Sequence, residues 1–232
     1  MSLTKIVGHN ILKFDLPYLI RSSIINGVKV PNYLSPFDRK RTSYDPIFQD
    51  TMHLYGAAEY GYLIKLETLA KSLGFKGGKT GSGKNFYKMS QDKKEEYLTA
   101  DLRMTEHVWQ RLNNSLSVSD DAIIFDIETA PRTEEEIEQI APAFDENSVL
   151  VGNLKDPDKI QQKIEKAEVN HISNLVNKAA LHAHYSQPCA IGYIHLDGKV
   201  QLDFSEPKEL LEQFWDTTAK VWGHAKEQIL NY

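Results

Sequence analysis

The chain is poor in cysteine and in long apolar runs, and each scarcity excludes a class of protein. Its 232 residues include one cysteine, Cys189, so no disulfide can form within the chain. This fits a reducing compartment, and we expect a cytoplasmic protein. No apolar run approaches the roughly 18 residues that a membrane span needs. The first residues also lack the basic and apolar stretches of a secretory signal, so we expect no membrane partner.

An excess of positive charge is also lacking, which argues against a protein that coats nucleic acid along its length. The net charge is −5 at pH 7. Residues 1–116 nevertheless carry 17 Lys and Arg against 11 Asp and Glu, whereas residues 117–232 carry 10 against 21. A basic half and an acidic half fit a site that holds phosphates in one part and metal in another. Chance variation in surface composition is the alternative.

Strand-like and helix-like segments alternate along the chain, which predicts an α/β class with a mixed central sheet flanked by helices. With 41% apolar residues the chain can bury a sizeable core, and we expect a single domain over residues 1–232. We expect strands at residues 5–8, 47–54, 122–126, 189–195, 199–204 and 220–223. We expect helices at residues 14–25, 64–73, 90–112 and 207–217, and across most of the polar stretch 132–182. Residues 113–121 are small and polar, which is typical of a linker.

The strongest local signal is a pair of carboxylates, Asp126 and Glu128, which follow an apolar strand. Residues two apart on a strand project from the same face, so these two side chains lie together. Neighbouring carboxylates repel each other unless they share a proton or a cation. Hard divalent cations such as Mg²⁺ take oxygen ligands, which this pair offers. A metal site is therefore the favoured explanation, and a polar strand end that meets solvent is the alternative.

Two further acidic positions carry weaker signals when each is taken alone. Asp15 follows a strand and a short turn and lies in the first turn of an expected helix. Helix capping, or the attraction of a carboxylate to the helix N-terminus, would be enough to explain it. Tyr97 and Asp101 are four residues apart on another expected helix, so they share a face. A half-buried tyrosine beside an exposed acid would give the same pattern.

Taken together, the three patterns resemble the motifs of the DEDD exonuclease superfamily. The matching residues are the pair Asp126 and Glu128, the series Asn10, Phe14 and Asp15, and the pair Tyr97 and Asp101. The tyrosine indicates the DEDDy branch. The chain is most similar to predicted 3′–5′ exonucleases related to the proofreading domain of family B DNA polymerases, with further similar stretches at 66–74 and 189–193. The resemblance implies a ribonuclease H-like exonuclease fold.

The resemblance also implies a mechanism. Two Mg²⁺ or Mn²⁺ ions about 4 Å apart would straddle the scissile phosphate of a single strand and release nucleoside 5′-monophosphates, from DNA in preference to RNA. The implied metal ligands are Asp126, Glu128, Asp15 and Asp101, and Tyr97 would orient the attacking water. Expected substrate contacts are Thr129, Asn10, Phe14, Lys79 and Lys84. For the two lysines a solvated loop is the alternative, and for Phe14 it is core packing.

The order of the motifs departs from that family, because the Asp-x-Glu pair comes last. Residues 1–112 carry the second and third motifs and residues 122–232 carry the first. A circular permutant that closes into one domain is our first explanation. The second is that the chain joins the second half of one exonuclease unit to the first half of the next, so that sites are completed between chains. Lys5–His9 and Lys220–His224 share a Lys-x-x-Gly-His pattern that suits the same strand position, and exchange between two chains in a domain-swapped homodimer would place both segments. The third is that the order reflects where the gene was cut.

Two other functions remain open from the sequence. The tyrosine branch also includes ribonucleases, so trimming of RNA is a second enzymatic interpretation. If the rotated order leaves the four acids apart, the chain would be a catalytically silent nucleic-acid-binding or assembly module. The two classes of function differ in one geometric feature, which is whether the acidic residues converge.

Overall fold

The computed structural model describes residues 5–31, 48–56, 63–81, 83–116, 122–179, 182–194 and 198–230. We predicted one domain, and the chain divides into two compact units. The sheet unit comprises Met1–Thr129 with Pro188–Tyr232, and the helical unit comprises Ala130–Gln187. The predicted site residues all belong to the sheet unit. Within the described ranges, no helix is both long enough and apolar enough to cross a membrane.

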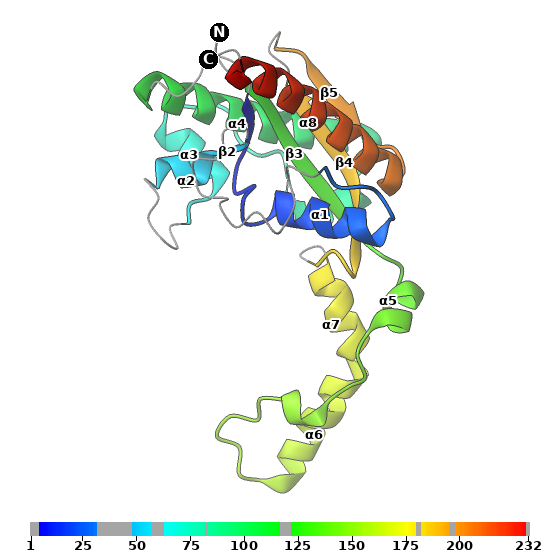
Figure 1. Cartoon of the computed structure of the whole chain (residues 1–232). Coiled ribbons are helices and arrows are strands. Elements are labelled where there is room, and N and C mark those ends of the chain that lie inside the picture. Colours follow the sequence, from blue (N-terminus) through cyan, green and yellow to red (C-terminus); the bar gives the residue numbers. More distant parts are fainter. Residues whose placement is uncertain are drawn as a thin grey trace. The chain divides into compact units, whose positions relative to one another are not determined.

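A mixed sheet of five strands forms the centre of the fold, as the alternation of elements predicted. Its strands are β1 (Lys5–Gly8), β2 (Phe48–Asp50), β3 (Ala122–Pro131), β4 (Ser186–Ile194) and β5 (Val200–Asp203). The order across the sheet is β2-β1-β3-β4-β5 (Figure 1). β1 pairs in parallel with β2 and with β3, whereas β4 and β5 are antiparallel. The two central strands β1 and β3 read as apolar runs because helices cover both of their faces.

Helices lie on both faces of this sheet. α1 (Asp15–Ile25) and α8 (Pro207–Leu230) lie on one face and α4 (Gln91–Leu116) on the other (Figure 1). Side chains alternate along β3 accordingly: Phe125 meets Phe214 of α8 with ring centroids 5.2 Å apart, whereas Ile124 belongs to the cluster that Leu98 of α4 joins. Gly192 of β4 permits the close approach of α4, because a Cβ there would lie 2.9 Å from Leu98 Cγ.

Shorter elements complete the two units. In the sheet unit, α2 (Thr51–Tyr55) and α3 (Leu66–Ser72) pack against α4, and the 3₁₀ helix η2 (Gly83–Lys88) precedes α4. The helical unit contains α5 (Glu134–Ile140), the 3₁₀ helix η3 (Glu146–Ser148), α6 (Pro157–Val169) and α7 (His171–Lys178). α5 packs against α7 in that unit. The prediction of a polar, mostly helical stretch at 132–182 is therefore confirmed over its described residues.

Most of the other predicted elements are also confirmed, with shifted ends. The strands at 5–8, 122–126, 189–195 and 199–204 correspond to β1, β3, β4 and β5, and the helices at 14–25, 64–73 and 90–112 to α1, α3 and α4. The helix at 207–217 is the first part of α8. The predicted linker is shorter than expected, because α4 continues through Leu116. Its remaining residues, 117–121, lie outside the described part of the chain.

One predicted strand, at residues 47–54, is too long. β2 ends at Asp50 and α2 begins at Thr51. The carboxylate of Asp50 accepts the backbone N–H groups of Met52 and His53 at 3.0 and 3.5 Å. An aspartate that satisfies the first free N–H groups favours the start of a helix at that point.

The strand predicted at residues 220–223 is wrong, because these residues continue α8. The buried positions of this helix recur at helical spacing through that segment, at Leu210, Leu211, Phe214, Trp215, Thr218 and Val221. A continuing apolar face outweighs the local likeness to residues 5–9. Residues 220–223 therefore do not take the position of β1 in the sheet. The observation that motivated a domain-swapped dimer no longer supports it.

Candidate metal centre

β3 presents the two carboxylates of the strongest sequence signal. Its residues Ile123–Phe125 are buried, and beyond them Asp126 and Glu128 are partly buried with Ile127 fully packed between them. Alternation along a strand places Asp126 and Glu128 on the face of Ile124, which is the face that α4 covers. The pair therefore projects from the sheet toward α4.

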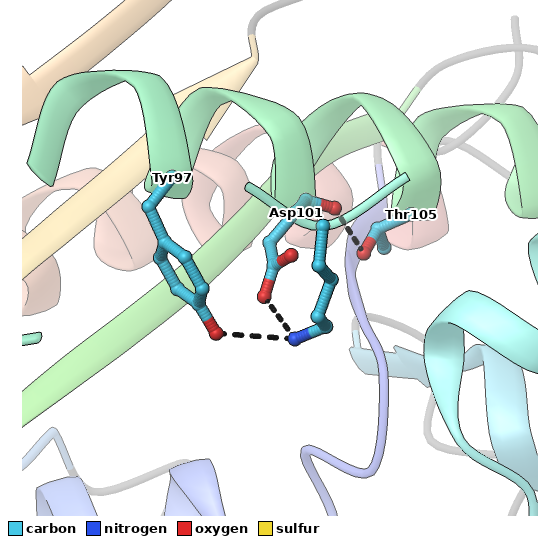
Figure 2. A network of polar contacts seen from close by, with 4 residues as sticks. Tyr97, Asp101 and Thr105 are labelled. Carbon is cyan, nitrogen blue, oxygen red and sulfur yellow. Dashed lines mark hydrogen bonds and ion pairs between the residues drawn. The ribbon is translucent and has the colours of Figure 1, made fainter. Parts of the chain in front are cut away.

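α4 supplies the next two residues of the site. Tyr97 and Asp101 are buried, 3% and 4% exposed, and in Figure 2 their side chains extend from one side of the helix. The hydroxyl of Thr105 donates to the backbone carbonyl of Asp101 at 3.0 Å (Figure 2). One carboxylate oxygen from each of Asp101, Asp126 and Glu128 lies within 4.8 Å of the other two. Three of the four predicted metal ligands thus converge within one chain.

Asp15, the fourth predicted ligand, lies beside this cluster without belonging to the group of three. It is buried in the first turn of α1, 4% exposed. Burial, with a contribution from the charge of Asp50, raises the pKa of Asp15 to about 7. The charge of Asp15 in turn contributes to the raised pKa values of Asp126 and Glu128, so it faces the same acidic cluster.

The concentration of negative charge shifts the protonation of the cluster. Burial, followed by the charge of Glu128, raises the pKa of Asp126 well above its ordinary value. Burial and the charge of Asp101 raise the pKa of Glu128 to about 8. Burial also raises the pKa of Asp101, and with the charge of Asp101 it raises that of Tyr97. Carboxylates held together in this way are stabilised by a proton or by a cation.

These shifts predict how the stability of the protein depends on pH without a divalent ion. A carboxyl whose pKa is raised by folding stabilises the folded state while protonated, and this contribution is lost as pH rises through the raised pKa. For Asp15 and Glu128, whose pKa values are raised to about 7 and about 8, the loss runs from about pH 4 to about pH 9. In EDTA, we expect the free energy of unfolding, from urea titrations, to fall by about 3–4 kcal/mol from pH 6 to pH 8.5. Glu128→Gln should show a smaller fall, and a stability that rises with pH would contradict the argument.

Lys79 brings one positive charge into the cluster. Its Nζ donates to Asp101 Oδ2 at 2.6 Å and to the hydroxyl oxygen of Tyr97 at 3.1 Å. The same ammonium group lies 5.2 Å from the centroid of the Tyr97 ring. Burial by itself would lower the pKa of Lys79, but the hydrogen bond and charge of Asp101 outweigh it and raise the pKa. Lys79 therefore stays charged and offsets part of the negative charge of the cluster.

One carboxylate oxygen of Asp101, Oδ1, is buried and has no hydrogen-bond partner among the described residues. An unpaired buried carboxylate oxygen is costly, and such atoms in native proteins require an explanation. A hard cation shared with Asp126 and Glu128 would supply the missing partner, because Mg²⁺ and Mn²⁺ prefer carboxylate oxygens. The donor set of the cluster fits such an ion.

The five predicted substrate contacts differ in their burial and in their neighbours. Asn10, in a left-handed conformation with φ of 66°, shapes the turn before α1, where its carbonyl accepts the N–H groups of Lys13 and Phe14. Phe14 is partly buried and stacks on Tyr18 with centroids 5.8 Å apart. Lys79 contacts Asp101, as described above. Thr129 is buried in β3. The side chain of Lys84 lies outside the described part of the structure.

Two residues that shape the site were missed from the sequence. Gly83 lies so close to the cluster that a Cβ there would be 3.1 Å from the Tyr97 hydroxyl and 3.5 Å from Glu128 Oε2. Its signal was the glycine-rich composition of the loop before α4. Asp50 also accepts the backbone N–H groups of Asn10 and Leu12, at 2.9 and 3.1 Å, and so anchors the turn that leads to Asp15. An aspartate that ends a strand gives no hint of this long-range contact.

Comparison of the chain with known protein families, with curated proteins and with solved structures gave no match in any of the three.

Proposed function

We propose that this protein is a metal-dependent 3′–5′ exonuclease that removes nucleoside 5′-monophosphates from single-stranded DNA. The observation that carries the proposal is the convergence of Asp101, Asp126 and Glu128, with oxygens within 4.8 Å of one another. The Oδ1 of Asp101, which is buried without a hydrogen-bond partner among the described residues, is a further oxygen that such a cation could take. Tyr97, one helical turn before Asp101, completes the arrangement that the motif resemblance implies.

The proposal extends to the fold, which we take to be a ribonuclease H-like domain in a circularly permuted order. If the strands are counted from β3, the order across the sheet becomes 3-2-1-4-5, with the Asp126 strand first and central. In that numbering α8 leads directly into β1, and α8 does pack against β1. Joining the two ends and opening the chain between α4 and β3 would restore the motif order of the family. This arrangement supports a single chain as the source of the whole site.

Within this proposal the residues have distinct roles. Asp101, Asp126 and Glu128 would hold one divalent ion, and Asp15 with Asp126 would hold the second. When bound, such ions generate a water nucleophile at neutral pH and neutralise charge on the phosphate. The hydroxyl of Tyr97 stays protonated at neutral pH because its pKa is raised, so it orients a reactant rather than removing its proton.

The alternatives differ in how much support they retain. A silent module was motivated by the chance that a rotated chain leaves its acids apart, and the convergence of three of them removes that motive. A ribonuclease would use the same carboxylates and the same ions, so the acidic cluster favours neither DNA nor RNA. The choice of DNA rests on the resemblance of the chain to proofreading domains.

Degradation of 5′-labelled single strands tests the proposal directly. Matched DNA and RNA oligonucleotides are incubated with the protein and Mg²⁺ or Mn²⁺, and the products are resolved by length. We expect a ladder that shortens from the 3′ end of the DNA, with slower shortening of the RNA, and no ladder in EDTA. Faster shortening of RNA would make the protein a ribonuclease. No shortening of either strand with both metals would reject the exonuclease.

A further inference from the structure

Lys79 places an ammonium group against the acidic cluster that we propose to bind metal. We propose that Lys79 competes with the divalent ion for Asp101. When the ion binds, the side chain of Lys79 leaves the cluster. This inference rests on the metal centre proposed above and adds a control on its occupancy. It makes the loop that carries Lys79 part of the metal site.

Lys79 contacts Asp101 directly and acts on the other carboxylates of the cluster through its charge. Its Nζ lies 2.6 Å from Asp101 Oδ2, in an ion pair whose carboxylate side chain is 6% exposed. The charge of Lys79 also lowers the pKa values of Asp126 and Glu128 against the trend that burial sets. One ammonium group therefore lies within electrostatic range of three carboxylates that lie within 4.8 Å of one another.

A divalent ion in the same cluster would meet this ammonium group at short range. Mg²⁺ and Mn²⁺ bind oxygens at about 2.0–2.2 Å, so an ion held by Asp101 lies only a few ångströms from a cation on the other oxygen. Two positive charges so close in a largely buried site repel strongly, because little water screens them. The ion and Lys79 therefore oppose each other, and each weakens the binding of the other by the same factor.

The surroundings of Lys79 allow its side chain to leave. The side chain is 30% exposed, so the ammonium group can reach water without crossing the core. Its side-chain hydrogen-bond partners in the described part of the chain are Asp101 and Tyr97, so expulsion breaks these two hydrogen bonds by a change of side-chain rotamers.

The test measures binding of Mn²⁺ itself, from the loss of the free-ion signal in electron paramagnetic resonance. We compare wild type, Lys79→Met, Lys79→Arg, Lys76→Met and Asp126→Asn. Lys76 is exposed in the same loop, so Lys76→Met removes an equal charge away from the cluster. We expect Lys79→Met to bind Mn²⁺ about tenfold more tightly than wild type. Lys79→Arg and Lys76→Met should stay within about threefold of wild type, because the first keeps the charge and the second lies elsewhere.

A second readout follows Lys79 in the wild-type protein. Acetylation of lysines by a brief pulse of reagent, read by mass spectrometry, should show Lys79 protected in EDTA and several-fold more reactive when Mn²⁺ is added. Lys76 should react equally in both conditions.

The outcomes separate the two proposals. If Lys79→Met binds Mn²⁺ no more tightly than wild type while Asp126→Asn loses binding, the metal centre stands and the role of Lys79 is rejected. If wild type and Lys79→Met both fail to bind Mn²⁺, or Asp126→Asn binds it as wild type does, the metal centre itself is rejected, and the role of Lys79 with it.

Discussion

Replacement of Asp126 by Asn is expected to lower the proposed exonuclease activity by about a thousandfold or more. Asp126 is the carboxylate that both proposed ions would share, and metal ions contribute several kcal/mol of charge stabilisation to such transition states. A loss of about 4 kcal/mol corresponds to about a thousandfold in rate. The measurement is the single-turnover rate of 3′ shortening of a labelled DNA strand in Mg²⁺.

Two comparisons test whether the loss of activity comes from misfolding of the variant or from the loss of any carboxylate. Because burial and the charge of Glu128 oppose ionisation of Asp126, a neutral Asn should leave the metal-free protein at least as stable as wild type. The urea midpoint in EDTA checks this. Asp92→Asn removes an exposed carboxylate from the first turn of α4 and should retain activity within about twofold. Residual activity of Asp126→Asn within tenfold of wild type would remove Asp126 from the reaction.

Replacement of Asp50 by Ala is expected to cause the largest loss of stability near the site. Asp50 is buried, and its carboxylate accepts four backbone N–H groups, those of Asn10, Leu12, Met52 and His53. Alanine would leave these donors without a partner, and each buried donor left unpaired costs about 1–3 kcal/mol. Since several of them are only partly buried, we expect a total loss of about 3–4 kcal/mol in the free energy of unfolding, measured with urea.

Asp50→Asn is the matched control, because the two side chains have nearly the same shape. Its amide oxygen can replace Oδ1, which serves Asn10 and Met52, but its NH₂ group would face the N–H of Leu12. We expect a loss about half that of the alanine variant. The alanine variant should also bind Mn²⁺ more weakly, because the turn that positions Asp15 loses its anchor. A loss of less than 1 kcal/mol in Asp50→Ala would show that water satisfies these donors.

The sequence predicted the parts of the site that depend on local periodicity. Asp126 and Glu128 share a face because they are two apart on a strand, and Tyr97 and Asp101 share one because they are four apart on a helix. Neither period says which helix lies over which strand. The approach of Asp101 to Asp126 and Glu128 depends on the packing of α4 on the sheet, and only the motif resemblance anticipated it.

Other features were not predicted because they depend on contacts between distant parts of the chain. Lys79 was expected to contact substrate, since a lysine in a glycine-rich loop gives no sign that a buried Asp101 lies opposite. The strand predicted at 220–223 rested on a five-residue likeness to the segment at β1. The structure follows instead the apolar face of α8, which extends over many more residues and buries Val221. A five-residue likeness to a strand is outweighed by an apolar face of many residues, because each further buried side chain adds to the stability of the helix.

The central position of β1 has a consequence for how the protein is made. β1 is synthesised well before its partner β3, since Ile6 pairs with Ile123, more than a hundred residues later in the chain. Until β3 emerges this apolar strand has one unpaired edge, and until α8 emerges the face that α8 packs against is uncovered. Such edges favour pairing with other chains, and contacts between distant residues form slowly. During synthesis the segment that carries β1 therefore faces a risk of aggregation that ends only when the later strand and helix have emerged, so the distance along the chain between β1 and β3 delays burial of the core.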